Sequence, residues 1–84
     1  MEVKKTMETK AAVIAIILKD VKASTEINAI LHEYNDCIIG RMGIPYREKG
    51  INIISIAVDA DLDTINTLAG KIGRIEGVSA KTVY

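Results

Sequence analysis

Apolar and polar positions follow two different periods along this chain, and the changes of period predict its secondary structure. From Thr9 to Lys19 almost every position is apolar and many are β-branched, which is typical of a strand covered on both faces. The same pattern returns from Ile51 to Asp59, interrupted only by Asn52 and Ser55. We therefore predict that these two segments are the central strands of a sheet.

Two further segments show the i, i+3, i+4, i+7 spacing of amphipathic helices. The apolar stripe of the first helix consists of Ile27, Ile30, Leu31 and Tyr34. The apolar stripe of the second helix consists of Ile65, Leu68, Ala69 and Ile72. Asp61 is expected to cap the start of the second helix, and Gly73 is expected to occupy the position just after its end.

The remaining segments predict edge strands. Residues 36–46 form an apolar stretch, but Gly40, Gly43 and Pro45 weaken ladder pairing and favour a place at the edge of a sheet. Gly50 is expected to adopt a positive φ in the reversal that follows. Residues 78–84 alternate apolar and polar side chains, as a half-exposed strand does.

The order strand, helix, strand, strand, helix, strand predicts an α+β fold of the ferredoxin-like βαββαβ type. In this topology a four-stranded antiparallel sheet carries two helices on one face, and the first and third strands lie in the middle. Residues 9–84 are predicted to form this single domain, and residues 1–8 a flexible N-terminal tail.

Alternation along the two central strands assigns each side chain to one face of the sheet. The face under the helices is expected to hold Ile14, Ile16, Leu18, Ile54, Ile56 and Val58. The opposite face is expected to hold Val13, Ala15, Ile17, Ile51, Ile53 and Ala57. A monomer would leave this second apolar set in water, so we predict a homodimer or a homotetramer that covers it.

Composition narrows the possible partners and locations. The 84 residues include 11 Lys plus Arg and 11 Asp plus Glu, so no net charge attracts nucleic acid or an anionic membrane. Cys37 is the only cysteine, which excludes an intrachain disulfide and fits a reducing compartment. The sequence shows neither a membrane-spanning run nor a signal peptide, and a cytoplasmic location is expected.

The sequence offers little chemistry for catalysis. No glycine-rich phosphate loop is present, and the single histidine, His32, has no evident nucleophile and orienting carboxylate around it. We therefore expect neither enzymatic activity nor a cofactor. His32 and Cys37 are the best candidates for a metal shared between subunits, although one pair falls short of a site within one chain.

A small ligand is the other possibility that the polar residues leave open. Asp20, Lys22 and Ser24 stand where the first strand meets the first helix, and Arg41 lies on the predicted second strand. Backbone N–H groups at a helix start favour anions, so these four residues are a candidate ligand-binding set. Helix capping and solvated charge are the more ordinary interpretations of the same residues.

The segment from His32 to Tyr46, with its string Ile-Ile-Gly-Arg-Met-Gly-Ile-Pro-Tyr, resembles a family of short bacterial proteins named as regulators of iron-only hydrogenase systems. The resemblance continues through the strand from Ile51 to Asp59 and into the C-terminal segment from Gly77 to Tyr84. It implies a ferredoxin-like fold related to ACT domains and to the C-terminal domain of the nickel-responsive regulator. Both of these oligomerise and bind small ligands or metal between subunits.

The chain differs from the nickel regulator in having one histidine and no ribbon-helix-helix arm, so neither nickel binding nor direct DNA binding is expected. The function predicted from pattern and resemblance together is a small homo-oligomeric regulatory or sensing module. Two alternatives stay open, a structural protein–protein adaptor that binds no ligand and an intersubunit metal sensor that uses His32 and Cys37.

Overall fold

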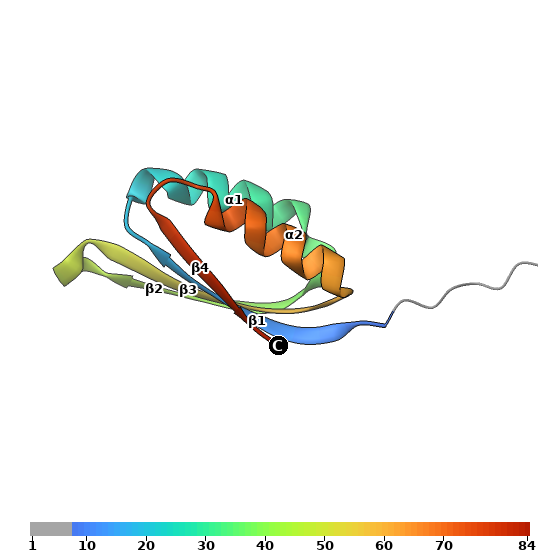
Figure 1. Ribbon diagram of the computed structural model, residues 1–84. Helices are drawn as coiled ribbons and strands as arrows, with labels where there is room; N and C mark the ends of the chain where they lie inside the picture. The colour runs from blue at the N-terminus through green and yellow to red at the C-terminus, as the bar shows by residue number, and fades with distance from the viewer. Residues whose placement is uncertain (1–7) are drawn as a thin grey trace, which may run out of the picture.

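The computed structural model describes residues 8–84, and the fold follows the predicted order of elements (Figure 1). Its strands and helices are β1 (Lys10–Leu18), α1 (Ser24–Glu33), β2 (Ile38–Tyr46), β3 (Ile51–Ala60), α2 (Leu62–Gly73) and β4 (Val78–Val83). Short 3-10 turns are η1 (Val21–Ala23), η2 (Asn35–Cys37) and η3 (Arg47–Lys49). The predicted tail, residues 1–8, lies outside the described residues apart from Glu8.

The strands form one four-stranded sheet in the order β2-β3-β1-β4, and every neighbouring pair is antiparallel. This confirms the ferredoxin-like α+β fold, with the two most apolar strands in the middle. In the β1–β3 register Ile14 lies opposite Ile56, and Ile16 lies opposite Ile54. Paired residues of an antiparallel ladder point to the same face, so these pairs build one continuous apolar layer.

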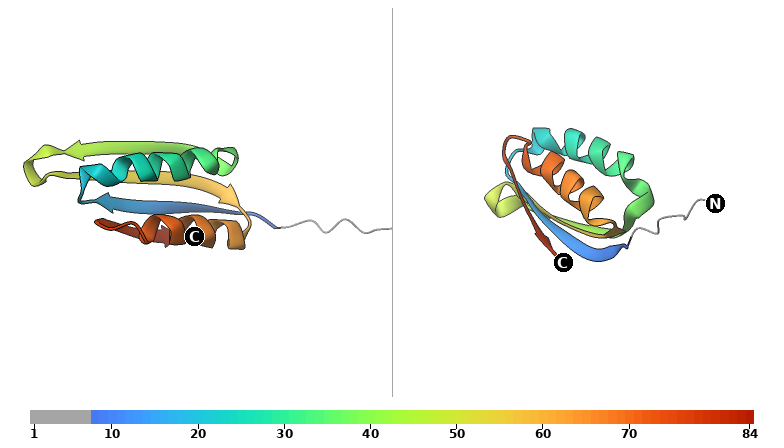
Figure 2. Two further views of the ribbon diagram at one scale, coloured as in Figure 1. Left: turned by 90° about the horizontal axis from the view of Figure 1, so that it is seen from above. Right: turned by 45° about the vertical axis from the view of Figure 1, so that its right-hand side comes forward.

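Both helices cover the same face of the sheet, and no helix of the described residues lies over the other face (Figures 1 and 2). The core lies between the helices and the sheet. Its buried residues are Ala12, Ile14, Ile16, Leu18, Ala23, Ile27, Leu31, Ile54, Ile56, Val58, Ala60, Ile65, Leu68, Ile72 and Ile75. All six side chains predicted to face the helices are in this set, because the even-numbered positions of both central strands face the helices as predicted.

The turn chemistry was predicted correctly at two positions and wrongly at one. Asp61 caps α2 by accepting a hydrogen bond from the Thr64 backbone N–H at 3.1 Å, and Gly50 has φ 64° in the β2–β3 reversal. Gly73, however, is the last residue of α2 rather than the residue beyond its end. The positive φ falls at Gly77, with φ 82°, because the chain continues through Ile75 into the core before it turns into β4.

The β2–β3 hairpin projects beyond the ends of the helices (Figure 1). The register of β2 against β3 shifts between Ile38 and Gly40, which is the signature of a β-bulge. The bulge leaves Ile39 65 % exposed. As predicted, β2 is an edge strand, and the bulge with Pro45 blunts that edge against continuous pairing.

Candidate functional site

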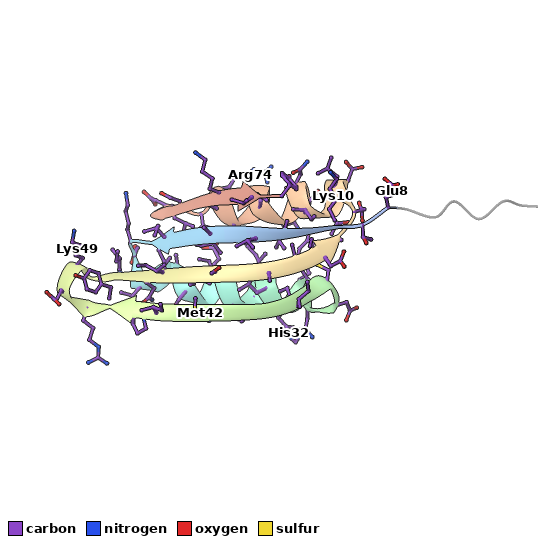
Figure 3. The ribbon with its side chains drawn as sticks, turned by 90° about the horizontal axis from the view of Figure 1, so that it is seen from below. Glu8, Lys10, His32, Met42, Lys49 and Arg74 are labelled. Atoms are coloured by element: carbon purple, nitrogen blue, oxygen red, sulfur yellow. The ribbon has the colours of Figure 1, made fainter. Side chains whose placement is uncertain are left out.

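The sheet face away from the helices, here called the open face, is the one that Figure 3 shows from below, and all four strands contribute apolar side chains to it. The six side chains predicted for it from the central strands are all exposed or only partly buried. In the β2–β3 register Ile44 lies opposite Ile53, and Met42 lies opposite Ser55, so β2 extends the same surface. The large exposed side chains of the open face are Val13 at 41 %, Met42 at 59 %, Ile44 at 48 %, Tyr46 at 38 %, Ile53 at 38 % and Val83 at 64 %.

Sequence reasoning missed the contribution of β2 to the open face. Met42, Ile44 and Tyr46 stand at every second position, which is the signal for one face of a strand. Glycine and proline between them were interpreted only as marks of an edge strand. With β2 included, three large apolar side chains join the four that the central strands provide, which are Val13, Ile17, Ile51 and Ile53.

A groove with a volume of about 310 Å³ lies on the other side of the sheet, between α1 and β2. It is lined by Leu18, Ser24, Ile27, Asn28, Arg41, Gly43, Ile44, Pro45, Asn52 and Ile54. Buried side chains from β1, α1 and β3 form its apolar part, and two asparagines, a serine and an arginine supply polar groups. Two of the four predicted ligand residues, Ser24 and Arg41, line it together.

Among residues 8–84, Arg41 is the only charged residue that lines the groove. Its position opposite Ile56 places it on the helix-facing side of β2, where its Nη2 donates a hydrogen bond to the Asn28 Oδ1 of α1 at 3.1 Å. Within residues 8–84 the guanidinium has no carboxylate in ion-pair contact, because the single ion pair of that stretch joins Lys71 and Glu33. The groove therefore has a positive charge that no neighbouring acid neutralises.

Gly43 keeps the groove open beside Arg41. It lies opposite Ile54, so a side chain at this position would share the helix-facing side of the sheet. A Cβ added here would meet no atom within 4 Å. The space in front of Gly43 is thus part of the groove rather than filled core.

The structure separates Asp20 and Lys22 from this groove. The Asp20 carboxylate accepts a hydrogen bond from the Lys22 backbone N–H at 3.0 Å and so caps η1. The Ser24 hydroxyl donates to the Val21 carbonyl oxygen at 2.8 Å. The capping interpretation therefore accounts for Asp20, and neither Asp20 nor Lys22 lines the hollow that holds Arg41.

His32 and Cys37 lie near each other in sequence but in different surroundings. His32 is exposed in the last turn of α1 (Figure 3), whereas the Cys37 thiol is half-buried and donates to the Tyr34 carbonyl oxygen at 3.3 Å. Burial raises the pKa of the Cys37 thiol, which disfavours the thiolate that metals bind. Among residues 8–84 no three His, Cys, Asp or Glu side chains cluster as a metal site would require.

A polar contact between the two helices accounts for another charged group. The Lys71 Nζ lies 3.4 Å from the Glu33 Oε2 and 5.0 Å from the centre of the Tyr34 ring. Hydrogen bonding to Tyr34 and the charge of Glu33 raise the pKa of Lys71. This cluster joins the last turn of α1 to the last turn of α2, and none of its residues lines the groove between α1 and β2.

Comparison with known proteins places the chain in a family. Residues 10–82 match the family described as "TM1266-like: Iron-only hydrogenase system regulator, putative". The chain belongs to this family. Among solved structures it is similar to the uncharacterized protein TM1266 from Thermotoga maritima, with 38 % identity and a TM-score of 0.87 over 90 % of this chain and 96 % of that one. This agrees with the resemblance noted from the sequence.

The family name points to regulation rather than to catalysis. A search of curated proteins found no match. Within residues 8–84 no helix is both long and apolar enough to cross a membrane.

Proposed function

We propose that this protein is a homo-oligomeric regulatory module of an iron-only hydrogenase system, in which copies pair through their open faces. The observation that carries the proposal is the apolar surface that Val13, Met42, Ile44 and Ile53 spread over the uncovered side of the sheet. Family membership supports the link to the hydrogenase system. Sensing then depends on how a ligand or a partner changes the paired state.

The size of the open face favours pairing. Its exposed side chains together leave on the order of 500 Å² of apolar surface in water, at the upper end of what soluble monomers show. A typical stable interface buries about 800 Å² per partner, so this patch could form most of one. Removing about 500 Å² per copy from water at about 25 cal/mol per Å² gives about 12 kcal/mol per copy, before the costs of association are subtracted.

A second copy is the occupant that the chemistry of the open face favours. Two sheets pack face to face at about 10 Å when aliphatic side chains interdigitate, and this face offers mostly aliphatic and small residues. Its charged side chains lie toward the margins, with Lys81 on the edge strand β4 and Asp59 near the end of β3. An adaptor that docks a different protein there is the competing function, and the same experiment separates the two.

The experiment is the mass in solution combined with a test in the host. At micromolar concentration the purified protein should sediment as a multiple of its 9.1 kDa chain mass. A host that carries a pairing-deficient variant in place of the natural protein should show altered hydrogenase activity, and a host without the gene should show the same change. A monomeric mass would overturn the pairing, and unchanged hydrogenase activity in the host that carries the variant would overturn the regulatory role assigned to it.

A monomer that forms a stoichiometric complex with another protein would support the adaptor instead.

Of the four ligand residues predicted from the sequence, Asp20, Lys22, Ser24 and Arg41, the proposal keeps only Ser24 and Arg41. Ser24 and Arg41 belong to a groove that pairing would leave accessible, since it lies on the helix-facing side of the sheet. Asp20 serves as a cap, and nothing in its contacts supports a ligand role.

A further inference from the structure

We infer that the groove between α1 and β2 binds a small aliphatic carboxylate, with the anionic group at Arg41 and the hydrocarbon part over Leu18, Ile27 and Ile54. This inference deepens the proposed function, on which it rests for its regulatory meaning, by naming the class of ligand that the module senses. The groove itself lies within one copy, so binding can be measured whether or not the copies pair.

The charge of the groove selects an anion. Arg41 is its sole charged lining residue, and its guanidinium contacts no carboxylate within the described chain. The hydrogen bond to Asn28 uses one N–H of Nη2 and fixes the side chain against α1. The remaining N–H groups of the planar fork are suited to a carboxylate, which accepts two parallel hydrogen bonds from arginine.

The rest of the lining selects an apolar body of limited size. Leu18, Ile27 and Ile54 are buried core residues that form the floor of the groove, with Ile54 keeping 8 % exposure, and Pro45 also lines it. A volume of about 310 Å³ is at the lower limit of ligand sites, so it suits a metabolite of a few carbon atoms rather than a nucleotide. A second hollow of about 230 Å³ adjoins it through shared lining residues and gives room for a longer chain.

The lining also disfavours an α-amino acid. An ammonium beside the carboxylate would need an acidic partner, and no Asp or Glu of the part of the chain that the structure describes lines the groove. It would also lie close to the like charge of Arg41. Ser24, Asn28 and Asn52 can instead hydrogen-bond a neutral substituent, such as a hydroxyl or a keto oxygen.

Strand β2 connects this groove with the open face. Alternate positions of β2 belong to opposite faces of the sheet. The helix-facing positions are Arg41, Gly43 and Pro45, and the positions between them, Met42 and Ile44, lie opposite open-face residues of β3. A ligand that draws Arg41 and the backbone around Gly43 toward α1 therefore moves side chains of the pairing surface. That geometry gives carboxylate binding a direct route to the oligomeric state.

The test is an NMR titration of the full chain, labelled with ¹⁵N, with isovalerate as the probe. We expect saturable shifts of the amides of Asn28, Arg41 and Gly43, with a dissociation constant on the order of millimolar. Isovaleramide has the same shape without the charge, and inorganic phosphate has the charge without the hydrocarbon. Each should bind at least about tenfold more weakly than isovalerate.

Two variants and two matched controls locate the site. Arg41→Gln should weaken isovalerate binding at least about tenfold, while Arg74→Gln removes the same charge from the end of α2 and should leave binding unchanged. Gly43→Val should block the groove without touching Arg41. Gly40→Val is the control for that change, because Gly40 pairs with Ala57 on the open face and its added side chain would also meet open space.

Each outcome decides the inference. It is overturned if isovalerate gives no saturable shifts, if isovaleramide or phosphate binds as well as isovalerate, or if Arg41→Gln binds normally. A protein that binds isovalerate but sediments as a monomer keeps the groove assignment and removes the pairing proposal. A protein that pairs but binds none of the probes keeps the pairing proposal and removes the groove assignment.

Discussion

Replacing Ile53 by glutamate should separate the copies without unfolding the chain. Ile53 lies on the central strand β3, flanked across the ladders by Ile17 and Ile44, and it is 38 % exposed. The exposed part of such a side chain is about 65 Å², which corresponds to about 1.6 kcal/mol when it leaves water. Two-fold symmetry applies the change to both copies, so about 3 kcal/mol of pairing free energy is lost.

Burying two unpaired carboxylates adds a further penalty, so the dissociation constant should rise by at least about 100-fold. Sedimentation velocity over a dilution series measures this constant, and far-ultraviolet circular dichroism checks that the monomer keeps its secondary structure. Ile53→Val is the matched control, because it stays apolar and β-branched. It removes one CH2 from each copy, about 1.6 kcal/mol in the pair, and should change the constant by no more than about 15-fold. A glutamate variant that pairs as tightly as the natural protein would refute the assignment of the interface to the open face.

Three further predictions test the fold. Ile56→Ala, at a fully buried position, should lower the free energy of unfolding by about 2–5 kcal/mol, measured by urea titration at concentrations where the chain is monomeric. Met42→Ala on the open face should change the same free energy by less than about 1 kcal/mol. Hydrogen bonds from Thr64 lower the pKa of Asp61, so the stabilisation by this cap is present above the usual aspartate pKa near 3.8 and is lost as pH falls through the lower folded value. In calorimetry, the melting temperature of the natural protein should exceed that of Asp61→Asn by less and less over that acid range. A difference that grows as the pH falls would contradict the cap. Gly77→Ala should destabilise by about 1–2 kcal/mol because of its φ of 82° and an added Cβ 3.1 Å from Asp20, while Gly73→Ala should be neutral or stabilising; equal effects would contradict the assigned turn.

The sequence predicted the fold well because its strongest signals are periodic and redundant. In β1 and β3, β-branched residues on both alternating sets indicated central strands, and the register pairs those sets as expected, with Ile14 opposite Ile56. The two helices were visible from one apolar stripe each. The misplaced turn glycine shows the limit, because a glycine near a helix end marks several possible endings and only the packing of Ile75 decides between them.

Only half of the candidate site could be predicted from the sequence, because the groove is formed by tertiary packing. Arg41 and Ser24 were identified from residue type, but their common groove depends on the position of α1 over β2, which no local pattern specifies. Asn28 and Asn52 were not recognised, since an asparagine on a helix or a strand carries no signal until its neighbours are known. Gly43 was interpreted as a strand-weakening residue, whereas its lack of a side chain leaves the groove open.

Intermolecular contacts between methyl groups test the central claim most directly. In a sample that mixes ¹³C-labelled and unlabelled copies, isotope-filtered NOE spectra report only contacts from one copy to another. The account predicts such contacts at the methyl groups of Val13, Met42, Ile44 and Ile53, and none at the exposed sides of α1 and α2. Contacts confined to the helices, or no contacts between copies at all, would contradict the claim that the open face is where the copies meet.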